Sequence, residues 1–349
     1  MGKDGGRPVF VIAEAGSNWK MGTPSRDLAA ARAMIEEAAE AGADAVKFQT
    51  FRPETVYVEN AGDSDYLSSA GIKEPILKIL QDMVMPYEMI PELAVHCGKC
   101  GIRFMSSPFS VADAKAVDPY VKVHKIASYE ISHIRLLEFV ASTGKPIILS
   151  TGGAKLEEIE WAVSHMHKCG AQKIMLLQCT AKYPAPLATL NLRAIPELRR
   201  RFKVPVGLSD HSREPLIGPL GAVALGAAAI EKHFTLHNRL PGPDHAYAIT
   251  PDELKQMVRA IRQMEEALGS GRKEPHEAEQ ELRTFGIRAL QATKAISKGE
   301  ALSEGVNFNI LRPGKQRQGL HPRYMPEVEG RKAARDIPLG DGILEGDFE

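Results

Sequence analysis

The sequence predicts an α/β protein built as a (β/α)8 barrel, followed by a small β-rich domain. Eight short apolar runs alternate with stretches whose apolar residues recur every three or four positions. Continuous apolar strands that alternate with helices are typical of a parallel sheet covered by helices, and eight such units suit a closed barrel. An open doubly wound sheet is the alternative, but no G-x-G-x-x-G follows the first run.

The predicted helices and strands follow one another in a regular order. A helix at 26–42 repeats apolar residues at three and four positions and stops at Gly42, and similar patterns cover 156–170 and 215–226. The eight predicted strands are 9–16, 43–50, 102–109, 123–130, 146–152, 173–180, 205–211 and 228–235.

The character of the sequence changes after the last barrel unit. The stretch 267–283 is polar and contains glycine and proline, which indicates a linker. Beyond it, segments 294–302 and 335–343 resemble each other, each with a short hydrophobic strand and a glycine turn. We therefore expect a barrel at 1–268, a linker at 269–284 and a small β-rich domain at 285–349.

Composition and charge exclude several classes of protein. The 349 residues are 44% hydrophobic and 25% charged, with a formal net charge of zero, which argues against a nucleic-acid surface. No apolar run approaches the length of a membrane span, and the first ten residues lack the apolar core of a signal peptide. We expect a cytoplasmic protein with no nucleic-acid or membrane partner.

Cys97 and Cys100 form a C-x-x-C motif. No second such pair exists to complete a structural zinc site. The motif also ends a helical pattern for which Gly101 would be the cap. We interpret these cysteines as incidental to the end of a helix.

Every predicted strand ends in polar residues. The carboxyl ends of barrel strands converge on one mouth, and a polar side chain in a buried strand destabilises the fold unless it is hydrogen-bonded. A polar tip on all eight strands therefore indicates a functional site. The tips are Glu14, Lys47, Gln49, Ser107, Lys125, Ser128, Ser150, Thr180, Ser209, His211, Glu231 and His233.

Two histidines close neighbouring strands. His211 ends the seventh predicted strand and His233 the eighth, and adjacent strands lie about 4.8 Å apart. Two neutral imidazoles can then share one divalent cation, with open positions that suit catalysis. Each histidine taken alone is more simply an ordinary hydrogen-bonded residue. Their matched positions, with Asp210 and Glu231 nearby, favour the metal site.

Lysines and serines at the strand ends predict an anion site. Lys47 and Lys125 would repel each other in a barrel mouth unless an anion neutralises them. Serine hydroxyls beside lysines form a phosphate or carboxylate cradle. The alternative is that the two lysines form ion pairs with Glu14 and Glu130. The serines of this cradle are Ser128, Ser150 and Ser209.

A rigid turn follows the last predicted strand. Pro241, Gly242 and Pro243 fix the next two residues, Asp244 and His245. An acid held beside the mouth could bind hydroxyl groups or act as a base. The motif is weak evidence by itself, because a turn of this composition needs no function.

Nine short motifs occur in an order and spacing that together are highly specific. They are EAGSN (14–18), VKFQT (46–50), SPFS (107–110), KIASYE (125–130), PIILSTG (146–152), QCTAKYPAP (178–186), GLSDHS (207–212), EKHFT (231–235) and PGPDH (241–245). With these motifs the chain resembles the sialic acid synthases, which condense phosphoenolpyruvate with an N-acyl hexosamine. The resemblance covers nearly the whole length, and the C-terminal domain resembles the family's SAF domain, akin to type III antifreeze protein.

The resemblance implies a role for each matching residue. His211 and His233 would hold a divalent metal, usually manganese, with magnesium or cobalt as alternatives. For proton transfer in such a reaction, our candidates are Glu14 and a metal-bound water. Arg312, in the RPG turn at 312–314, would reach the partner subunit's barrel mouth in a homodimer with swapped SAF domains. The positions that bind phosphoenolpyruvate match Lys47, Lys125, Ser128, Ser150 and Ser209, and those that face the sugar match Glu14, Gln49, Tyr183 and Asp244.

Three positions depart from the pattern of the family. Trp19 stands where histidine is usual and would add an apolar surface near the sugar, and Gln178 also replaces a histidine. Ala181 replaces a serine or asparagine that helps to bind phosphate, a donor that Lys182 could replace.

The implied function is a nonulosonate synthase that joins phosphoenolpyruvate to an N-acyl aminosugar and releases phosphate. The acceptor is N-acetylmannosamine or a diamino-trideoxy analogue. Two alternatives stay open at this point: a metal-dependent barrel aldolase acting on a phosphorylated substrate, and a non-catalytic sugar-binding or scaffold relative in surface-polysaccharide assembly.

Overall fold

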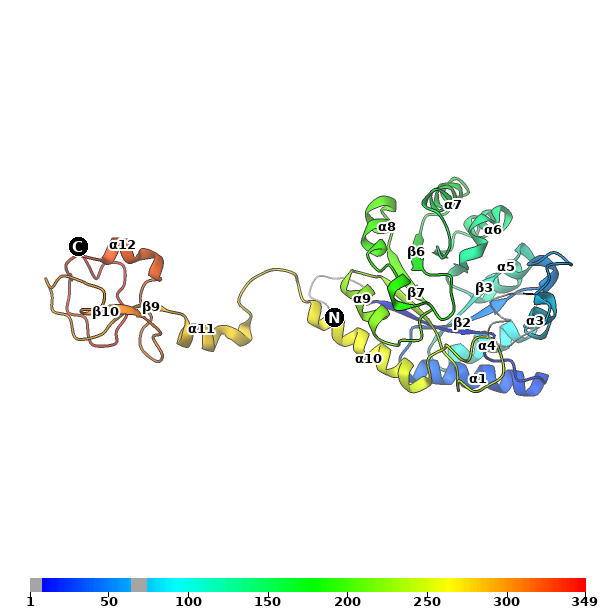
Figure 1. The fold of residues 1–349 in the computed structure, drawn as a ribbon, viewed down its shortest axis with the longest axis horizontal. Coiled ribbons are helices and arrows are strands. Elements are labelled where there is room, and N and C mark those ends of the chain that lie inside the picture. Colours follow the sequence, from blue (N-terminus) through cyan, green and yellow to red (C-terminus); the bar gives the residue numbers. More distant parts are fainter. Residues whose placement is uncertain (1–7, 64–73) are drawn as a thin grey trace. The chain divides into compact units, whose positions relative to one another are not determined.

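The computed structural model describes residues 8–63 and 74–349. It contains two compact units, Met1–Ser270 and Gly271–Glu349, each drawn in Figure 1. The first unit holds eight parallel strands in the order β3-β2-β1-β8-β7-β6-β5-β4, and β3 and β4 lie in contact to complete a near-closed barrel. The strands are β1 Phe10–Gly16, β2 Ala45–Thr50, β3 Arg103–Pro108, β4 His124–Ile126, β5 Ile147–Ser150, β6 Ile174–Cys179, β7 Val206–Asp210 and β8 Ala229–His233.

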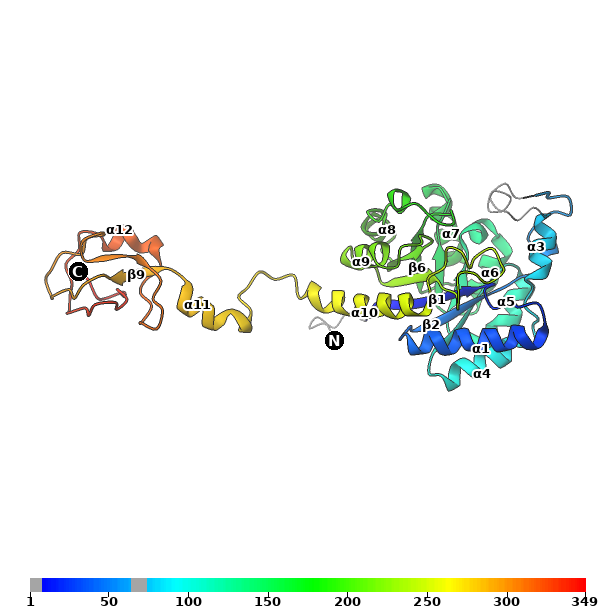
Figure 2. The same ribbon diagram turned by 60° about the horizontal axis from the view of Figure 1, so that its bottom comes forward.

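Helices surround the strands, as both views show (Figures 1 and 2). The α-helices of this unit are α1 Pro24–Glu40, α3 Ile76–Asp82, α4 Met89–Lys99, α5 Val111–Val117, α6 Ile134–Ser142, α7 Leu156–Lys168, α8 Ala194–Phe202, α9 Ile217–Ala224 and α10 Pro251–Leu268. Short 3₁₀ helices are η1 Pro53–Thr55, η2 Asp118–Tyr120, η3 Ser128–Ser132 and η4 Leu187–Thr189.

Helix α1 shows how the sequence covers the barrel. It begins with Pro24 at its first turn, where the fixed φ of proline suits a helix. Its buried face carries Ala31, Met34, Ile35 and Ala38, at the three- and four-residue spacing of one helix face. These side chains join the large apolar cluster between the strands and the helices.

The predicted (β/α)8 barrel is confirmed, and an observed strand lies within each of the eight predicted ranges. The main difference is the fourth strand, which was expected to run to residue 130 but ends at Ile126. The chain then turns into η3, so Ser128 and Glu130 belong to a 3₁₀ helix rather than to the strand.

The second unit has a core of its own. Strands β9 Ala289–Ala292 and β10 Phe308–Leu311 pair antiparallel, and the helices are η5 Glu277–Glu279, α11 Gln280–Gly286, η6 Pro322–Tyr324 and α12 Met325–Val328. The two similar segments meet at a bridge between Ile296 and Ile337, each 1% exposed. Both isoleucines belong to an apolar cluster that also contains Leu290, Leu302, Phe308 and Ile343.

None of the helices in residues 8–63 and 74–349 combines the length and the apolar composition of a bilayer-spanning helix.

Candidate active site

The candidate residues share a position on their strands. A small apolar cluster inside the barrel takes one side chain each from six strands: Ile12, Ala45, Met105, Ile148, Leu177 and Ala229. Side chains two or four positions further along a strand point to the same interior side of the barrel. They lie closer to the carboxyl ends of the strands. Those positions hold Glu14, Lys47, Gln49, Ser107, Ser150, Cys179, Glu231 and His233.

Lys47 connects the first three strands at the mouth. Its Nζ lies 2.6 Å from Glu14 Oε2 and donates to Ser107 Oγ at 2.9 Å. Gln49 Nε2 donates to the other oxygen of Glu14 at 3.1 Å. The register pairs Glu14 with Lys47 and Gln49 with Ser107, so neighbouring strands bring these groups together.

Lys125 on β4 forms a second group with residues of β5, β7 and β8. Its Nζ donates to Ser150 Oγ at 2.7 Å and lies 3.6 Å from Glu231 Oε1. That same carboxylate oxygen accepts a hydrogen bond from Ser209 at 3.0 Å. Because Glu231 Oε2 is also 3.9 Å from Lys47 Nζ, one acid lies between the two lysines.

The two acids of the mouth have different pKa values. Burial raises the pKa of Glu14 to about 7 in spite of Lys47. Burial acts on Glu231 too, but Lys125 and Lys47 hold the pKa of that carboxyl below its ordinary value. Near neutral pH, Glu231 is therefore the ionised acid, whereas Glu14 can carry a proton. Two acids separated in this way are typical of a site that performs proton transfer.

The two lysines also differ. Burial alone would lower the pKa of Lys47, but Glu14 and Glu231 raise it above its ordinary value. Burial lowers the pKa of Lys125, and Glu231 offsets this only in part. A phosphate or carboxylate beside Lys125 would favour its charged form. An anionic ligand therefore stabilises the charged form of Lys125 more than that of Lys47.

His211 and His233 lie side by side at the ends of β7 and β8. Their ring centres are 5.4 Å apart and the ring planes meet at 79°. An imidazole nitrogen about 2.1 Å from a cation places its ring centre roughly 3.3 Å away, so two ligands near a right angle have ring centres roughly 5 Å apart. The observed spacing fits a shared cation.

The surroundings of this pair also fit a divalent metal. Burial lowers the pKa of His211 to about 4, and burial followed by the nearby His211 lowers that of His233 well below its ordinary value, so both rings are neutral. His233 Nδ1 and Glu231 Oε2 are buried and have no hydrogen-bond partner among the described residues. Orphaned buried polar atoms indicate that another group completes the site.

Asp244 approaches the mouth from the turn after β8. Its Oδ2 lies 3.8 Å from His233 Nδ1, and a hydrogen bond from Tyr247 lowers its pKa, although burial dominates and raises it. A Cβ on Gly16 would lie 3.1 Å from Asp244 Oδ2 and 3.5 Å from both Gln49 Nε2 and Glu14 Oε1. Gly16 has φ +52°, so glycine is required there for conformation and for space.

Tyr183 lies over the histidines. Its ring stacks on that of His211, with centres 4.1 Å apart, and its centre is 5.1 Å from that of Tyr247. The site therefore has an aromatic side beside the histidines. Such a mixture of aromatic and hydrogen-bonding groups suits a sugar beside an anion.

Ser128 completes the anion side. Its Oγ accepts a hydrogen bond from the backbone N–H of Gly152 at 3.0 Å. A Cβ on Gly152 would come within 2.9 Å of both Ser128 Oγ and Cys179 Sγ, and within 3.3 Å of Ala181 Cβ. Ala181 therefore lines this corner of the mouth, whereas Lys182, which could have replaced the missing donor, is exposed.

Two interpretations of acidic residues need correction. Asp210 was expected near the histidines, but its Oδ2 pairs with Lys232 at 2.7 Å and packs against Gly218 of α9. It points away from the lumen because it alternates with Ser209. The alternative that the two lysines pair with Glu14 and Glu130 is right for Lys47 and Glu14 but wrong for Glu130, because the carboxylate beside Lys125 is that of Glu231.

Two of the departures from the family pattern lie outside the mouth. Trp19 was expected to offer an apolar surface near the sugar, but it is 1% exposed and belongs to the main apolar core. Gln178 alternates with the inward Leu177, and its Nε2 donates to Leu190 O at 3.2 Å. Of the three departures, only Ala181 changes the mouth itself.

Two further residues of the predicted set lie elsewhere. His245 is buried, and its Nδ1 is 2.6 Å from Thr235 Oγ1, so it fixes the turn that carries Asp244. Arg312 is exposed in the second unit. Its turn is tied down by a hydrogen bond from Gly314 N to Phe285 O at 3.1 Å.

Four further residues complete the site, two of which the sequence marked only as polar strand tips. Glu231 and Ser107 were recognisable as polar strand tips, and only the register shows that they contact the lysines. Cys179 Sγ lies 3.5 Å from His211 Nε2, and burial raises its pKa to about 11. Nothing in the sequence marks Tyr247, which reaches the site through the turn after Asp244.

Glu130 supplies a prediction about pH. Burial, with a smaller contribution from Asp113, raises the pKa of this carboxyl to about 7. Because the carboxyl binds its proton more tightly in the folded state, it contributes fully to the free energy of unfolding at pH values below its unfolded-state pKa of about 4.5. This contribution is lost as the pH rises from about 4.5 through 7. The loss is at most about 3 kcal/mol. Glu130→Gln should remove it, so the free energy of unfolding should fall less between pH 5 and pH 8.

Chemical denaturation at both pH values measures this effect, with the exposed Glu157→Gln as the control. If Glu130→Gln and Glu157→Gln show the same pH dependence as the unmodified chain, the buried acid contributes nothing.

These features define a class of protein: a (β/α)8 barrel whose mouth brings together two buried lysines, serine hydroxyls, two neutral histidines and a buried acid. The comparisons with known proteins then give the family. The NeuB family model matches residues 34–273, and the SAF domain model matches residues 287–349. The chain belongs to the NeuB family, and its C-terminal unit contains a SAF domain.

Several known proteins resemble the chain over most or all of its length. The spore coat polysaccharide biosynthesis protein SpsE of Bacillus subtilis is 42% identical, over 100% of this chain and 95% of that protein. The N,N'-diacetyllegionaminic acid synthase of Campylobacter jejuni is 41% identical, over 97% and 100%. The crystal structure of an N-acetylneuraminic acid synthetase from Leptospira borgpetersenii, in complex with citrate, matches with a TM-score of 0.70 and 36% identity, over 79% and 90%.

Proposed function

We propose that the chain is a nonulosonate synthase that joins phosphoenolpyruvate to an N-acyl aminosugar and releases phosphate. The single observation that carries this proposal is the arrangement of the mouth. Two lysines that share one carboxylate lie beside two neutral histidines and a carboxyl that can hold a proton. The acceptor is N-acetylmannosamine or a diamino-trideoxy hexose, in keeping with the relatives' names.

Each half of the mouth has its own substrate. Lys47 and Lys125 bind the phosphate and carboxylate of phosphoenolpyruvate, with hydrogen bonds from the hydroxyls of Ser107, Ser128, Ser150 and Ser209. The open-chain sugar lies on the side of Gln49, Tyr183 and Asp244. Holding both substrates in line removes the entropic cost of their encounter from the chemical step.

His211 and His233 hold the divalent cation, which we propose to be Mn²⁺. When bound, this ion supplies Lewis-acid polarisation of the sugar's aldehyde oxygen. Carbon 3 of phosphoenolpyruvate forms a bond to the aldehyde carbon, and the protonated Glu14 delivers the proton that the new hydroxyl requires. Water adds at carbon 2 and returns a proton to the Glu14 carboxylate. The C–O bond to phosphate then breaks as the new hydroxyl becomes the carbonyl oxygen, and its proton leaves with the phosphate.

Release of inorganic phosphate tests this function directly. With Mn²⁺, phosphoenolpyruvate and a panel of N-acyl aminosugars, we expect phosphate to appear only when an accepted sugar is present, with one product molecule formed for each phosphate. An aldolase would use or release pyruvate without phosphate, and a scaffold would bind without turnover. Either result would contradict the proposal.

Lys125→Met tests the anion cradle. The variant keeps the length of the side chain but removes a charge-assisted hydrogen bond, which contributes about 1.5–3 kcal/mol. We expect the KM for phosphoenolpyruvate to rise about ten- to hundredfold, with a smaller change in the KM for the sugar. Lys145→Met is the matched control, because Lys145 pairs with Asp118 outside the mouth. An unchanged KM for phosphoenolpyruvate in Lys125→Met would remove this lysine from the cradle.

Arg312 tests the proposed homodimer with swapped SAF domains. If the arginine reaches the sugar in a partner subunit, Arg312→Ala should raise the KM for the sugar about tenfold, the effect of one lost hydrogen bond to a charged group. The KM for phosphoenolpyruvate should change little. Lys315→Ala, an exposed change three residues away, is the control. Deleting residues 284–349 should have the same selective effect, and equal weakening of both substrates would show that the domain is merely structural.

A further inference from the structure

A second group of metal-ligating side chains lies in the helical layer around the barrel. Glu138 belongs to α6, His165 to α7, and Cys169 follows the end of α7. Among the described residues, these three form the one group of His, Cys, Asp or Glu side chains whose ligand atoms all lie within 4.8 Å of one another. None of them takes part in the proposed reaction.

The distances in this group suit a tetrahedral ion. His165 Nε2 lies 3.7 Å from Cys169 Sγ and 3.5 Å from Glu138 Oε1. Around Zn²⁺, with bonds of about 2.0 Å to nitrogen and oxygen and about 2.3 Å to sulfur, tetrahedral angles place such ligand atoms roughly 3.3–3.5 Å apart. The two distances from His165 are therefore within a few tenths of an ångström of those in a tetrahedral site, and the third, from Glu138 to Cys169, is at most 4.8 Å.

Neighbouring contacts hold two of the ligands in place. Arg135 donates to Glu138 Oε2 at 2.9 Å, which leaves Oε1 facing the histidine. Trp161 stacks flat on the ring of His165, with centres 5.4 Å apart and planes 7° from parallel. His165 and Cys169 are four residues apart, so they lie on one face of the helix.

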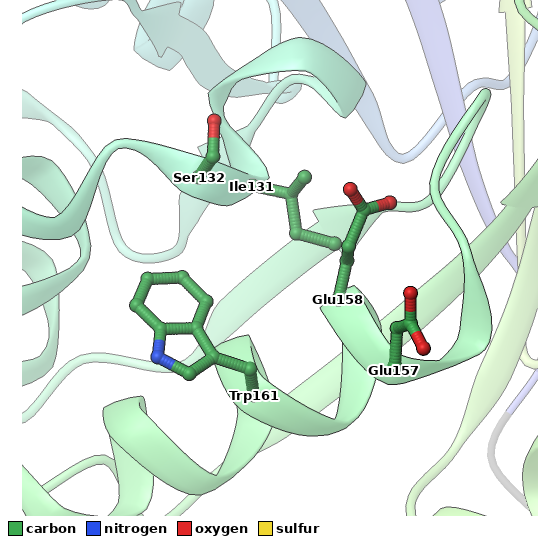
Figure 3. A pocket seen from close by; sticks show the side chains of 5 residues that line it. All are labelled: Ile131, Ser132, Glu157, Glu158 and Trp161. Atoms are coloured by element: carbon green, nitrogen blue, oxygen red, sulfur yellow. The ribbon is translucent and has the colours of Figure 1, made fainter.

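Trp161 also links the group to a pocket. The pocket is lined by Ile131, Ser132, Glu157, Glu158 and Trp161, and Figure 3 shows the residues of η3 facing those of α7 across it. The indole is 43% exposed, so it reports on both the pocket and the histidine beside it. The other tryptophan of the chain, Trp19, is buried in the main core.

We propose that Glu138, His165 and Cys169 form a second cation site, specific for thiophilic divalent metals such as Zn²⁺ and separate from the histidine pair of the mouth. A nitrogen, an oxygen and a thiolate sulfur are the ligand set that Zn²⁺ prefers, and water takes the fourth position. Because Glu138 lies on α6 and the other ligands on or next to α7, the bound ion ties two helices of the barrel wall together. An ion that binds only the folded state raises the free energy of unfolding.

Zinc binding to the full chain, stripped with a chelator and kept reduced, tests this proposal. We expect Cys169→Ser and His165→Gln each to bind one Zn²⁺ fewer per chain than the unmodified protein, or to bind that ion at least about tenfold more weakly. Cys100→Ser is the matched control, since Cys100 is a half-exposed cysteine that also follows a helix end. It should keep the full stoichiometry.

Two further measurements use the same proteins. Zn²⁺ should raise the Tm of the unmodified chain more than that of Cys169→Ser. Co²⁺ should quench the fluorescence of Trp161 in a phase that Cys169→Ser lacks and Cys100→Ser retains. The phosphate-releasing activity of Cys169→Ser should stay unchanged. If both ligand variants keep the stoichiometry, affinity and quenching of the unmodified chain, or if Cys100→Ser loses the ion equally, the second site does not exist.

Discussion

His211→Ala should abolish metal-dependent turnover while the barrel stays folded. In the proposed site this imidazole is one of two neutral nitrogen ligands at the ends of β7 and β8, so its loss would leave His233 to hold the cation without its neighbour. We expect the affinity for Mn²⁺ to fall at least about a hundredfold and kcat to fall about a thousandfold or more, the scale of losing a major electrostatic contribution. Titration of Mn²⁺ and the phosphate-release rate measure the two effects.

A matched control separates a ligand from an ordinary buried histidine. His124 is fully buried, and its Nε2 lies 3.0 Å from Asp118 Oδ1. It directly precedes Lys125 on β4, so the alternation of the strand turns its side chain away from the mouth. His124→Ala should lower the free energy of unfolding but keep the affinity for Mn²⁺. Full activity of His211→Ala in the absence of added metal would refute the ligand assignment.

The second large effect is expected for Glu14→Gln. The amide keeps the size of the side chain and an oxygen for Lys47, 2.6 Å away in the unmodified chain, but it cannot deliver a proton. Loss of a positioned general acid lowers kcat about 10²- to 10⁴-fold. The KM for phosphoenolpyruvate should change much less, because Lys47 and Lys125 remain.

Glu14→Asp shows whether the carboxyl itself matters. It keeps the acid and shortens its reach, so kcat should recover in part, whereas a merely structural role would leave both variants equally impaired. A kcat of Glu14→Gln within about threefold of the unmodified value would assign proton transfer to another group, because general acid catalysis contributes far more than this.

The sequence predicted the barrel well because its signal is local. Apolar runs and helical periodicity depend on neighbouring residues, and each of the eight strands lies within its predicted range. The fourth strand was predicted too long, because the sequence KIASYE has strand-like composition although its second half forms η3. Its end depends on contacts made across the mouth, such as that between Ser128 and Gly152.

The site was predictable as a set of polar tips, but not in its pairing. Asp210 and Glu231 both carry a carboxyl group, and they lie one and two residues before His211 and His233. Because side chains alternate along each strand, Glu231 faces the barrel interior and contacts the lysines, whereas Asp210 faces the outer side of the sheet and pairs with Lys232. Only the register and the facing of each strand decide this outcome, and a single sequence does not fix either.

Trp19 shows the same limit for an apolar residue. A large indole beside a polar motif can line a sugar site or fill the core, and the local sequence looks the same in both cases. Here the chain turns after Asn18, whose side chain donates to Phe234 O at 2.9 Å, and Trp19 enters the core. Tyr247 is the converse case, because an unremarkable tyrosine reaches the mouth only through the fold of its turn.

The most direct test of the whole account is anomalous X-ray diffraction from crystals soaked with Mn²⁺ and phosphoenolpyruvate. We predict a manganese peak within coordination distance of both His211 and His233, with the phosphate of the ligand against Lys47 and Lys125. Manganese bound to neither ring, with the phosphate outside the barrel mouth, would contradict the account.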